Sequence, residues 1–140
     1  MGIKNKNSQI NGYNKIVLKD ILIGEVWLCA GQSNIEMSAN WGIDSGEDEV
    51  AQANTPSIRF FTVPKISAQT PQNNLVANWE VCTPETMKRS SALAYFFAKR
   101  IQEDLKNVPI GLLVSAWGGT PAEIWMPEEV IKRDSILTSA

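Results

Sequence analysis

Three short, strongly hydrophobic segments restrict the folds open to this chain more than any other feature of its sequence. They occupy residues 25–30, 58–63 and 110–115, and such runs are typical of strands buried on both faces of a parallel sheet. Helical patterns at residues 45–53 and 90–105 separate them, and a further helix start follows the third segment. Strands that alternate with helices in this way predict an α/β fold with a mainly parallel sheet.

The remaining segments are less regular. Residues 1–13 are polar and rich in Asn and Lys, so we expect a loop there, with a short strand at residues 16–18. Residues 65–80 form a polar connection before the second helix. That helix, over residues 90–105, carries hydrophobic residues at every fourth position, which predicts the stripe that faces the core. The stripe consists of Leu93, Phe97, Ile101 and Leu105.

Composition and charge argue against several classes of function. The chain has 140 residues, of which 44% are hydrophobic and 20% charged, as expected of one globular domain. Its net charge of −2 argues against a nucleic-acid partner. No hydrophobic run approaches the roughly 20 residues of a membrane-spanning helix, and the polar start lacks the hydrophobic stretch of a signal peptide. We therefore expect neither a nucleic acid nor a membrane as partner.

Histidine is absent from the sequence, and this limits the catalytic chemistry. A serine hydroxyl becomes a good nucleophile when a base, usually histidine, removes its proton, so such a base has to come from outside these residues. Cys29 and Cys82 have no CxxC partner and no histidine to complete a zinc site. We expect two buried free thiols and no metal site, with a disulfide between them as the alternative.

Two turns that follow the first and third hydrophobic segments share one pattern. Residues 31–36 (Gly-Gln-Ser-Asn-Ile-Glu) and 118–123 (Gly-Gly-Thr-Pro-Ala-Glu) each place a hydroxyl residue after glycine and a glutamate three positions later. One interpretation is structural, because Ser-x-x-Glu and Thr-x-x-Glu are capping boxes. Ser33 and Thr120 would then cap helices, with Pro121 at a first helical position.

The other interpretation of these turns is functional. Ligands of open α/β sheets bind beyond the carboxyl ends of the strands, where the N–H groups of helix starts point outward. A serine at such a turn has an exposed hydroxyl, and a glycine on the neighbouring turn can supply a donor for an oxyanion. Ile35 stands where a Gly-x-Ser-x-Gly elbow needs its second glycine, so the usual α/β-hydrolase turn is disfavoured.

Large side chains near the turns also allow two interpretations. Trp41, Trp117 and Trp125 suit stacking on a sugar ring, although tryptophan more often packs in or beside a core. Glu36 and Glu123 could form a carboxylate pair for glycoside cleavage, but their capping positions disfavour this.

Three blocks of the sequence resemble one known family of enzymes. Residues 24–37 resemble the nucleophile block of the sialate O-acetylesterases, SGNH-type hydrolases related to acetylxylan esterases. Residues 90–97 are similar to the family's helix before its next strand, and residues 110–125 resemble its second block. The resemblance implies a three-layer α/β/α sandwich, incomplete in this chain. It also implies that residues 1–22 are the tail of a preceding β-rich region or a linker, and residues 23–140 the N-terminal portion of the esterase domain.

The resemblance further implies roles for individual residues. Ser33 is expected to attack the acetyl carbonyl, while the N–H groups of Ser33 and Gly119, with Gly118 as the alternative, hold the oxyanion. The implied substrate is an acetylated carbohydrate of the sialate type, and the implied mechanism needs no metal or organic cofactor. The expected substrate-binding residues are Gln32, Asn34, Trp41, Thr120 and Glu123.

The family takes its Asp-x-x-His pair and its remaining oxyanion side chain from later blocks, which have no counterpart here. We therefore expect this chain alone to be inactive, and the full-length protein to be a serine acetylesterase that is periplasmic or secreted. The alternative is a non-catalytic carbohydrate-binding or assembly module that retains the esterase fold. A sheet without its later strands has an uncovered edge, so we expect self-association or a partner chain that completes the fold.

Overall fold

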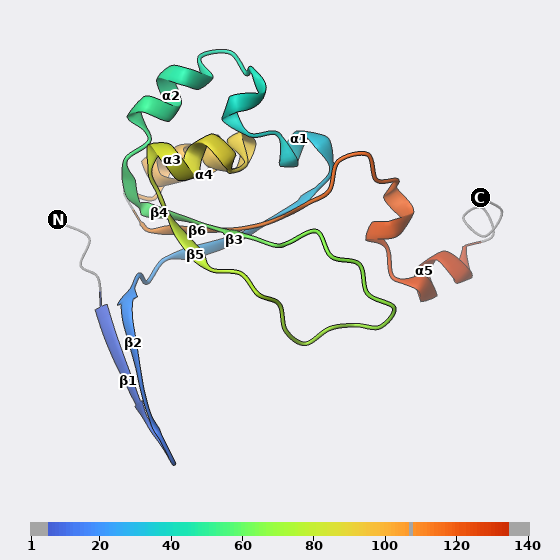
Figure 1. Ribbon diagram of the computed structural model, residues 1–140, viewed down its shortest axis with the longest axis horizontal. Coiled ribbons are helices and arrows are strands. Elements are labelled where there is room, and N and C mark those ends of the chain that lie inside the picture. Colours follow the sequence, from blue (N-terminus) through green and yellow to red (C-terminus); the bar gives the residue numbers. More distant parts are fainter. Residues whose placement is uncertain (1–5, 107, 135–140) are drawn as a thin grey trace.

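A four-stranded mixed sheet forms the centre of the structure (Figure 1). The computed structural model describes residues 6–106 and 108–134. In spatial order the strands are β3 (Glu25–Gly31), β6 (Ile110–Ala116), β4 (Thr55–Thr62) and β5 (Trp79–Cys82). Strand β6 runs parallel to both β3 and β4, whereas β5 pairs antiparallel with β4 at the edge. The three hydrophobic segments are therefore strands, and the prediction of an α/β fold with a mainly parallel sheet is confirmed.

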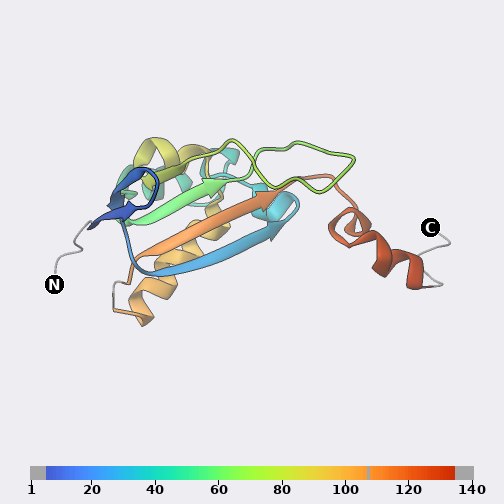
Figure 2. The ribbon, with the colours of Figure 1, turned by 90° about the horizontal axis from the view of Figure 1, so that it is seen from below.

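The main connecting helices lie on one face of this sheet (Figure 1). They are α2 (Gly46–Gln52), α3 (Pro84–Arg89) and α4 (Ala92–Asp104). Figure 2 shows the sheet from its other side, with the strands in front of the helices. On that side β3 is open to solvent, since Val26 is 58% and Leu28 is 68% exposed. The described residues thus supply one of the two helical layers of the expected sandwich. The shorter helices are α1 (Ser33–Glu36), η1 (Ala39–Trp41), η2 (Ala122–Trp125) and α5 (Glu128–Arg133).

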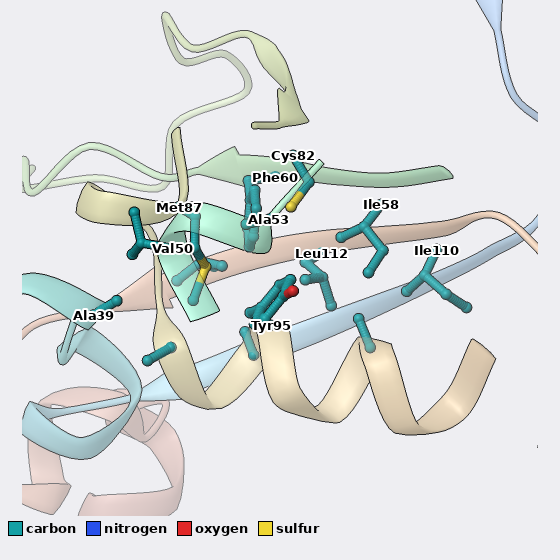
Figure 3. Packing of buried hydrophobic residues seen from close by; sticks show 14 residues of the cluster. Ala39, Val50, Ala53, Ile58, Phe60, Cys82, Met87, Tyr95, Ile110 and Leu112 are labelled. Carbon is teal, nitrogen blue, oxygen red and sulfur yellow. The ribbon is translucent and has the colours of Figure 1, made fainter. Parts of the chain in front are cut away.

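The hydrophobic core lies between the sheet and the helices (Figure 3). Alternate residues of the central strand, Ile110, Leu112 and Val114, are almost completely buried. Strand β4 adds Ile58 and Phe60, whose Cα atoms pair with those of Ile110 and Leu112. Burial of one such large side chain stabilises a fold by about 1.5–3 kcal/mol, so these two strands hold the sheet against its helical layer.

Helix α4 packs on the sheet through a different stripe from the one expected. Leu93 and Leu105 are 48% and 40% exposed, so the predicted stripe was wrong at these positions, and Phe97 and Ile101 are only partly buried. Small side chains face the sheet instead, because they let the helix backbone approach it closely. The buried residues of α4 are Ala92, Ala94, Tyr95, Ala98 and Gln102.

A β-hairpin precedes the sheet and extends away from it (Figure 1). Strands β1 (Lys6–Asn11) and β2 (Lys15–Ile21) pair antiparallel, so the expectation of a loop through residues 1–13 was wrong for residues 6–11. Residues 1–5 lie outside the described part. Arg59 of β4 connects the hairpin to the sheet. Its guanidinium group donates to the Asp20 carbonyl oxygen at 2.7 Å and contacts the Asp20 carboxylate at 2.9 Å.

The connection through residues 65–80 and beyond contains structure that the sequence pattern did not show. Strand β5 begins at Trp79, and α3 follows directly after Thr83. A capping box starts this helix, with the Thr83 hydroxyl accepting from the Thr86 N–H at 3.2 Å and the Thr86 hydroxyl accepting from the Thr83 N–H at 2.8 Å. Both elements are too short to show a hydrophobic period.

Both cysteines are free, so the disulfide alternative is excluded. Cys82 is fully buried in the core, and Cys29 is partly buried against it. Burial raises the pKa of both thiols, which favours their neutral form. Within residues 6–106 and 108–134, no helix has the length and hydrophobicity needed to cross a membrane.

Candidate active site

The two turns with the shared pattern lie side by side at one edge of the sheet. Parallel strands β3 and β6 end in register, with Gly31 paired to Ala116, and the Trp117 N–H continues the ladder by donating to the Gly31 carbonyl oxygen at 3.0 Å. Helix α1 follows β3 directly. A Cβ atom built on Gly118 would lie 3.5 Å from the Cα and 3.7 Å from the Cβ of Ser33. The parallel register therefore brings the second turn against the serine.

Ser33 is exposed at this edge of the sheet. Its hydroxyl donates to Gln32 Oε1 at 2.5 Å, and its backbone N–H donates to the same oxygen at 3.1 Å. Gln32, not Ser33, is the N-cap of α1. The capping-box interpretation of Ser33 was therefore wrong, because the preceding amide side chain performs that role and leaves the serine as the first helical residue.

Glu36 connects the first turn to the second and to the segment after β4. One oxygen of its carboxylate accepts the Gly118 N–H, and the other accepts from the Lys65 ammonium group. These two contacts, with Lys65 the stronger influence, lower the pKa of Glu36 and keep the side chain ionised. Lys65 was not identified from the sequence, because a lysine in a polar connection carries no signal of its spatial neighbours.

The Thr120 hydroxyl is used within its own turn. It donates to the Trp117 carbonyl oxygen at 2.6 Å and accepts from Trp125 Nε1 at 2.9 Å. The N-cap of η2 is Pro121, and no side chain caps it. The capping-box interpretation of Thr120 was therefore wrong as well, and Pro121 precedes the helix instead of opening it.

A cavity of about 410 Å³ lies beside the first turn, at the carboxyl ends of β4 and β6. Glu36, Trp41, Lys65 and Arg89 line it together with the strand ends. The Trp41 side chain is 56% exposed, so a large aromatic surface borders this cavity. Trp41 and Glu36 therefore border the same cavity.

The cavity beside the first turn is not lined by Asn34, Trp117, Trp125 or Glu123. Asn34 borders a separate, mostly hydrophobic cavity of about 540 Å³ between α1 and α4. Trp117 and Trp125 are 38% and 39% exposed, and Glu123 lies partly buried in η2. In the part of the chain that the structure describes, no three His, Cys, Asp or Glu side chains converge to hold a metal ion.

Another cavity lies away from these turns. It has about 650 Å³ and is lined by the hairpin, Arg59, Trp79 and the start of β6 near Pro109. Ligands of open α/β sheets bind at the carboxyl ends of the strands, whereas this cavity includes the starts of β3 and β6. Position at the sheet edge, and not volume, identifies the candidate active site.

Comparison with known proteins shows the family of this chain. The family of carbohydrate esterases described as sialic acid-specific acetylesterases matches residues 23–139. The chain belongs to this family. The crystal structure of a carbohydrate acetylesterase from Xanthomonas citri superimposes with a TM-score of 0.83 at 34% identity, covering 90% of this chain and 29% of that one. The fold is thus that of a carbohydrate acetylesterase.

Curated relatives carry the same family name. The chain is 35% identical to human sialate O-acetylesterase over 121 residues, which cover 81% of this chain and 23% of the human protein. It is 31% identical to the mouse sialate O-acetylesterase, covering 81% of this chain and 22% of the mouse protein. The match spans less than a quarter of the length of these relatives, so it establishes the family of this region.

Proposed function

We propose that Ser33 is the nucleophile of an enzyme that hydrolyses acetyl esters on sialate-type carbohydrates. The observation that carries this proposal is the exposed Ser33 at the carboxyl edge of the sheet, with the Gly118–Gly119 turn packed against it. Membership of the carbohydrate esterase family supports the ester class, and the exposed Trp41, on the same cavity as Glu36, supports a sugar substrate.

The reaction would proceed in two steps. The Ser33 oxygen forms a bond to the acetyl carbonyl carbon while a base takes its proton, and collapse of the tetrahedral intermediate breaks the bond to the sugar oxygen, which leaves with that proton. Water then hydrolyses the acetyl-serine and releases acetate. The carbonyl oxygen would take the place of Gln32 Oε1 at the Ser33 N–H, and the Gly119 N–H would be the second donor, since the Gly118 N–H binds Glu36.

The base would come from outside residues 1–140, because the sequence contains no histidine. The resemblance to the family implies the same for the remaining oxyanion side chain. The chain alone would then be inactive, and the complete gene product would be the active acetylesterase. Of the expected substrate contacts, Gln32 binds the Ser33 hydroxyl and Trp41 borders the same cavity as Glu36. Asn34, Thr120 and Glu123 remain candidate substrate contacts.

The decisive experiment measures acetate release from O-acetylated sialic acid by the complete gene product. Ser33→Ala is expected to lower turnover by at least about 10³-fold. Ser67→Ala, at an exposed serine in the polar segment after β4, serves as the matched control and is expected to leave turnover within about two-fold of the parent. Undiminished turnover in Ser33→Ala would eliminate the proposal.

The absence of histidine favours a second candidate, a non-catalytic carbohydrate-binding or assembly module. Covalent labelling of Ser33 by an organophosphonate in the complete gene product separates the two, because labelling requires an activated hydroxyl. Sugar binding without acetate release, and without labelling, would favour the second candidate.

We also infer that strand β3 is covered by further protein, either a second copy or a partner chain. Its outer positions Val26 and Leu28 are more than half exposed, and β3 is an edge strand that presents unpaired backbone groups. Light scattering of this chain at high concentration is expected to show particles larger than a monomer. A clean monomer would contradict the inference.

A further inference from the structure

Glu36 is held in a fixed position relative to the proposed nucleophile. It lies on the same helical turn as Ser33, where its N–H donates to the Gln32 carbonyl oxygen at 2.9 Å, and the Met37 N–H donates to the Ser33 carbonyl oxygen at 2.9 Å. From this turn the carboxylate reaches across to accept the Gly118 N–H. One side chain thus sets the separation between the serine and the second turn.

Successive amide groups of the second turn are bound to the first. The Trp117 N–H donates to the Gly31 carbonyl oxygen at 3.0 Å, and the next N–H, of Gly118, donates to Glu36. The amide that follows belongs to Gly119, an exposed residue with a φ of 76° and nothing within 4 Å of the position a Cβ would occupy. These two consecutive hydrogen bonds therefore orient the peptide group that carries the Gly119 N–H. The space beside Gly119 remains open.

The carboxylate of Glu36 has both oxygens occupied. Lys65 binds one and the Gly118 N–H the other, and the side chain is only 20% exposed. A carboxylate bound on both sides is poorly placed to exchange protons with a substrate. Its hydrogen bonds make it suited to holding a neighbouring backbone group instead.

We propose that Glu36 is a positioning residue, which holds the Gly118–Gly119 turn so that the Gly119 N–H points at the developing oxyanion beside Ser33. This inference rests on the proposed esterase function. A donor that stabilises an oxyanion must be oriented before the reaction, and a displacement of about 1 Å can cost about 10²-fold in rate.

Kinetics of the complete gene product test the proposal. Glu36→Ala removes the acceptor of the Gly118 N–H, so kcat is expected to fall by about 10–100-fold while KM changes by less than about three-fold. Glu36→Gln keeps an oxygen acceptor and is expected to recover most of kcat. Glu49→Ala is the matched control. Glu49 lies on the helical layer, forms an ion pair with Lys99 at 2.8 Å and has a similarly exposed side chain, at 24%. The kcat of this variant is expected to stay within about two-fold of the parent.

A spectroscopic measurement on the 140-residue chain separates this role from a general loss of structure. Trp41–Gly42 and Trp117–Gly118 are the two Trp-Gly pairs of the sequence, so carbonyl-¹³C tryptophan with ¹⁵N-glycine selects their two glycine amides. Glu36→Ala is expected to move the Gly118 amide signal upfield and speed its hydrogen exchange. The Gly42 signal is the internal control and is expected to stay unchanged.

The outcomes distinguish the two proposals. A gene product without Ser33-dependent acetate release overturns both the esterase function and the role of Glu36. An enzyme that depends on Ser33 but keeps its kcat in Glu36→Ala overturns the positioning role alone. Equal losses of kcat in Glu36→Ala and Glu36→Gln, with the Gly118 amide unmoved in both, would likewise overturn it.

Discussion

The turn after β3 and the turn after β6 share a sequence pattern but use their hydroxyl groups differently. The Thr120 hydroxyl bridges Trp117 and Trp125, so both of its hydrogen bonds stay inside the second turn. The Ser33 hydroxyl is exposed and bound to the side chain of its neighbour Gln32. A hydroxyl whose hydrogen bonds stay inside its turn stabilises the turn. A hydroxyl that remains exposed is available for chemistry.

The glutamates of the two turns differ in the same sense. Glu36 leaves its own helix start and binds the opposite turn at Gly118, whereas Glu123 belongs to a short 3₁₀ helix that no side chain caps. Neither forms the capping box that the spacing predicts. The first turn therefore provides the carboxylate, and the second turn provides the backbone N–H that the carboxylate binds.

Among changes to the contact between the two turns, the largest effect is expected at Gly118, where space is tightest. In Gly118→Ala the added Cβ would lie 3.0 Å from the Glu36 carboxylate and 3.5 Å from Ser33 Cα, so the carboxylate has to withdraw. We expect kcat/KM of the complete gene product to fall by about 10²-fold. Gly12→Ala at the hairpin turn, where a Cβ meets nothing within 4 Å, is the control for adding a methyl group. Equal kcat/KM values for the two variants would contradict the expected difference between the turns.

The parts of the fold that were predictable from the sequence are the strands with a continuous hydrophobic run. Residues 25–30, 58–63 and 110–115 became strands because buried parallel strands have no polar face to interrupt the hydrophobic run. Strand β5 and helix α3 span only a few residues each, so they show no period. The stripe of α4 was misassigned because spacing gives the period of a helix but not which side chains, large or small, face the sheet.

The candidate site was predictable to a similar extent. Parallel strands end at one edge, which was sufficient to expect Ser33 near Gly118 before any coordinates. The partner of Glu36 was not predictable, because a carboxylate can bind its own helix start or a chain segment 82 residues away. Lys65 could not be found for the same reason, since its contact with Glu36 spans 29 residues through a segment without regular structure.

A smaller effect, on stability, is expected at the second turn. Thr120→Val preserves the shape of the side chain but removes the hydrogen bonds to Trp117 and Trp125, so the free energy of unfolding should fall by about 1–2 kcal/mol. Ser33→Ala should change it by less than about 0.5 kcal/mol, because that hydroxyl binds only an exposed neighbour. Urea unfolding followed by circular dichroism measures both. A larger loss in Ser33→Ala would reverse the assignment of structural and chemical roles.

The smallest expected effect is a pH dependence that belongs to the first turn. The pKa of Glu36 is lowered by Lys65 and the Gly118 N–H, so the folded state binds the proton more weakly than the unfolded state. Its contribution to stability is therefore present above the ordinary glutamate pKa of about 4.3 and is lost as the pH falls through the lowered value. Because the Lys65 side chain is 43% exposed, this contribution should be at most about 1 kcal/mol.

Urea midpoints of the parent chain and Glu36→Gln, measured from neutral pH down to about pH 3, test this dependence. The parent should be the more stable at neutral pH, and the difference should disappear in acid. Lys65→Met removes the stronger of the two influences on Glu36, so the pH-dependent loss should be smaller in that variant and complete at a higher pH. A difference between parent and Glu36→Gln that stays constant with pH would mean that the carboxylate gains nothing from its charge. The link between the turns would then depend on the hydrogen bond to Gly118 and not on the charge of the carboxylate.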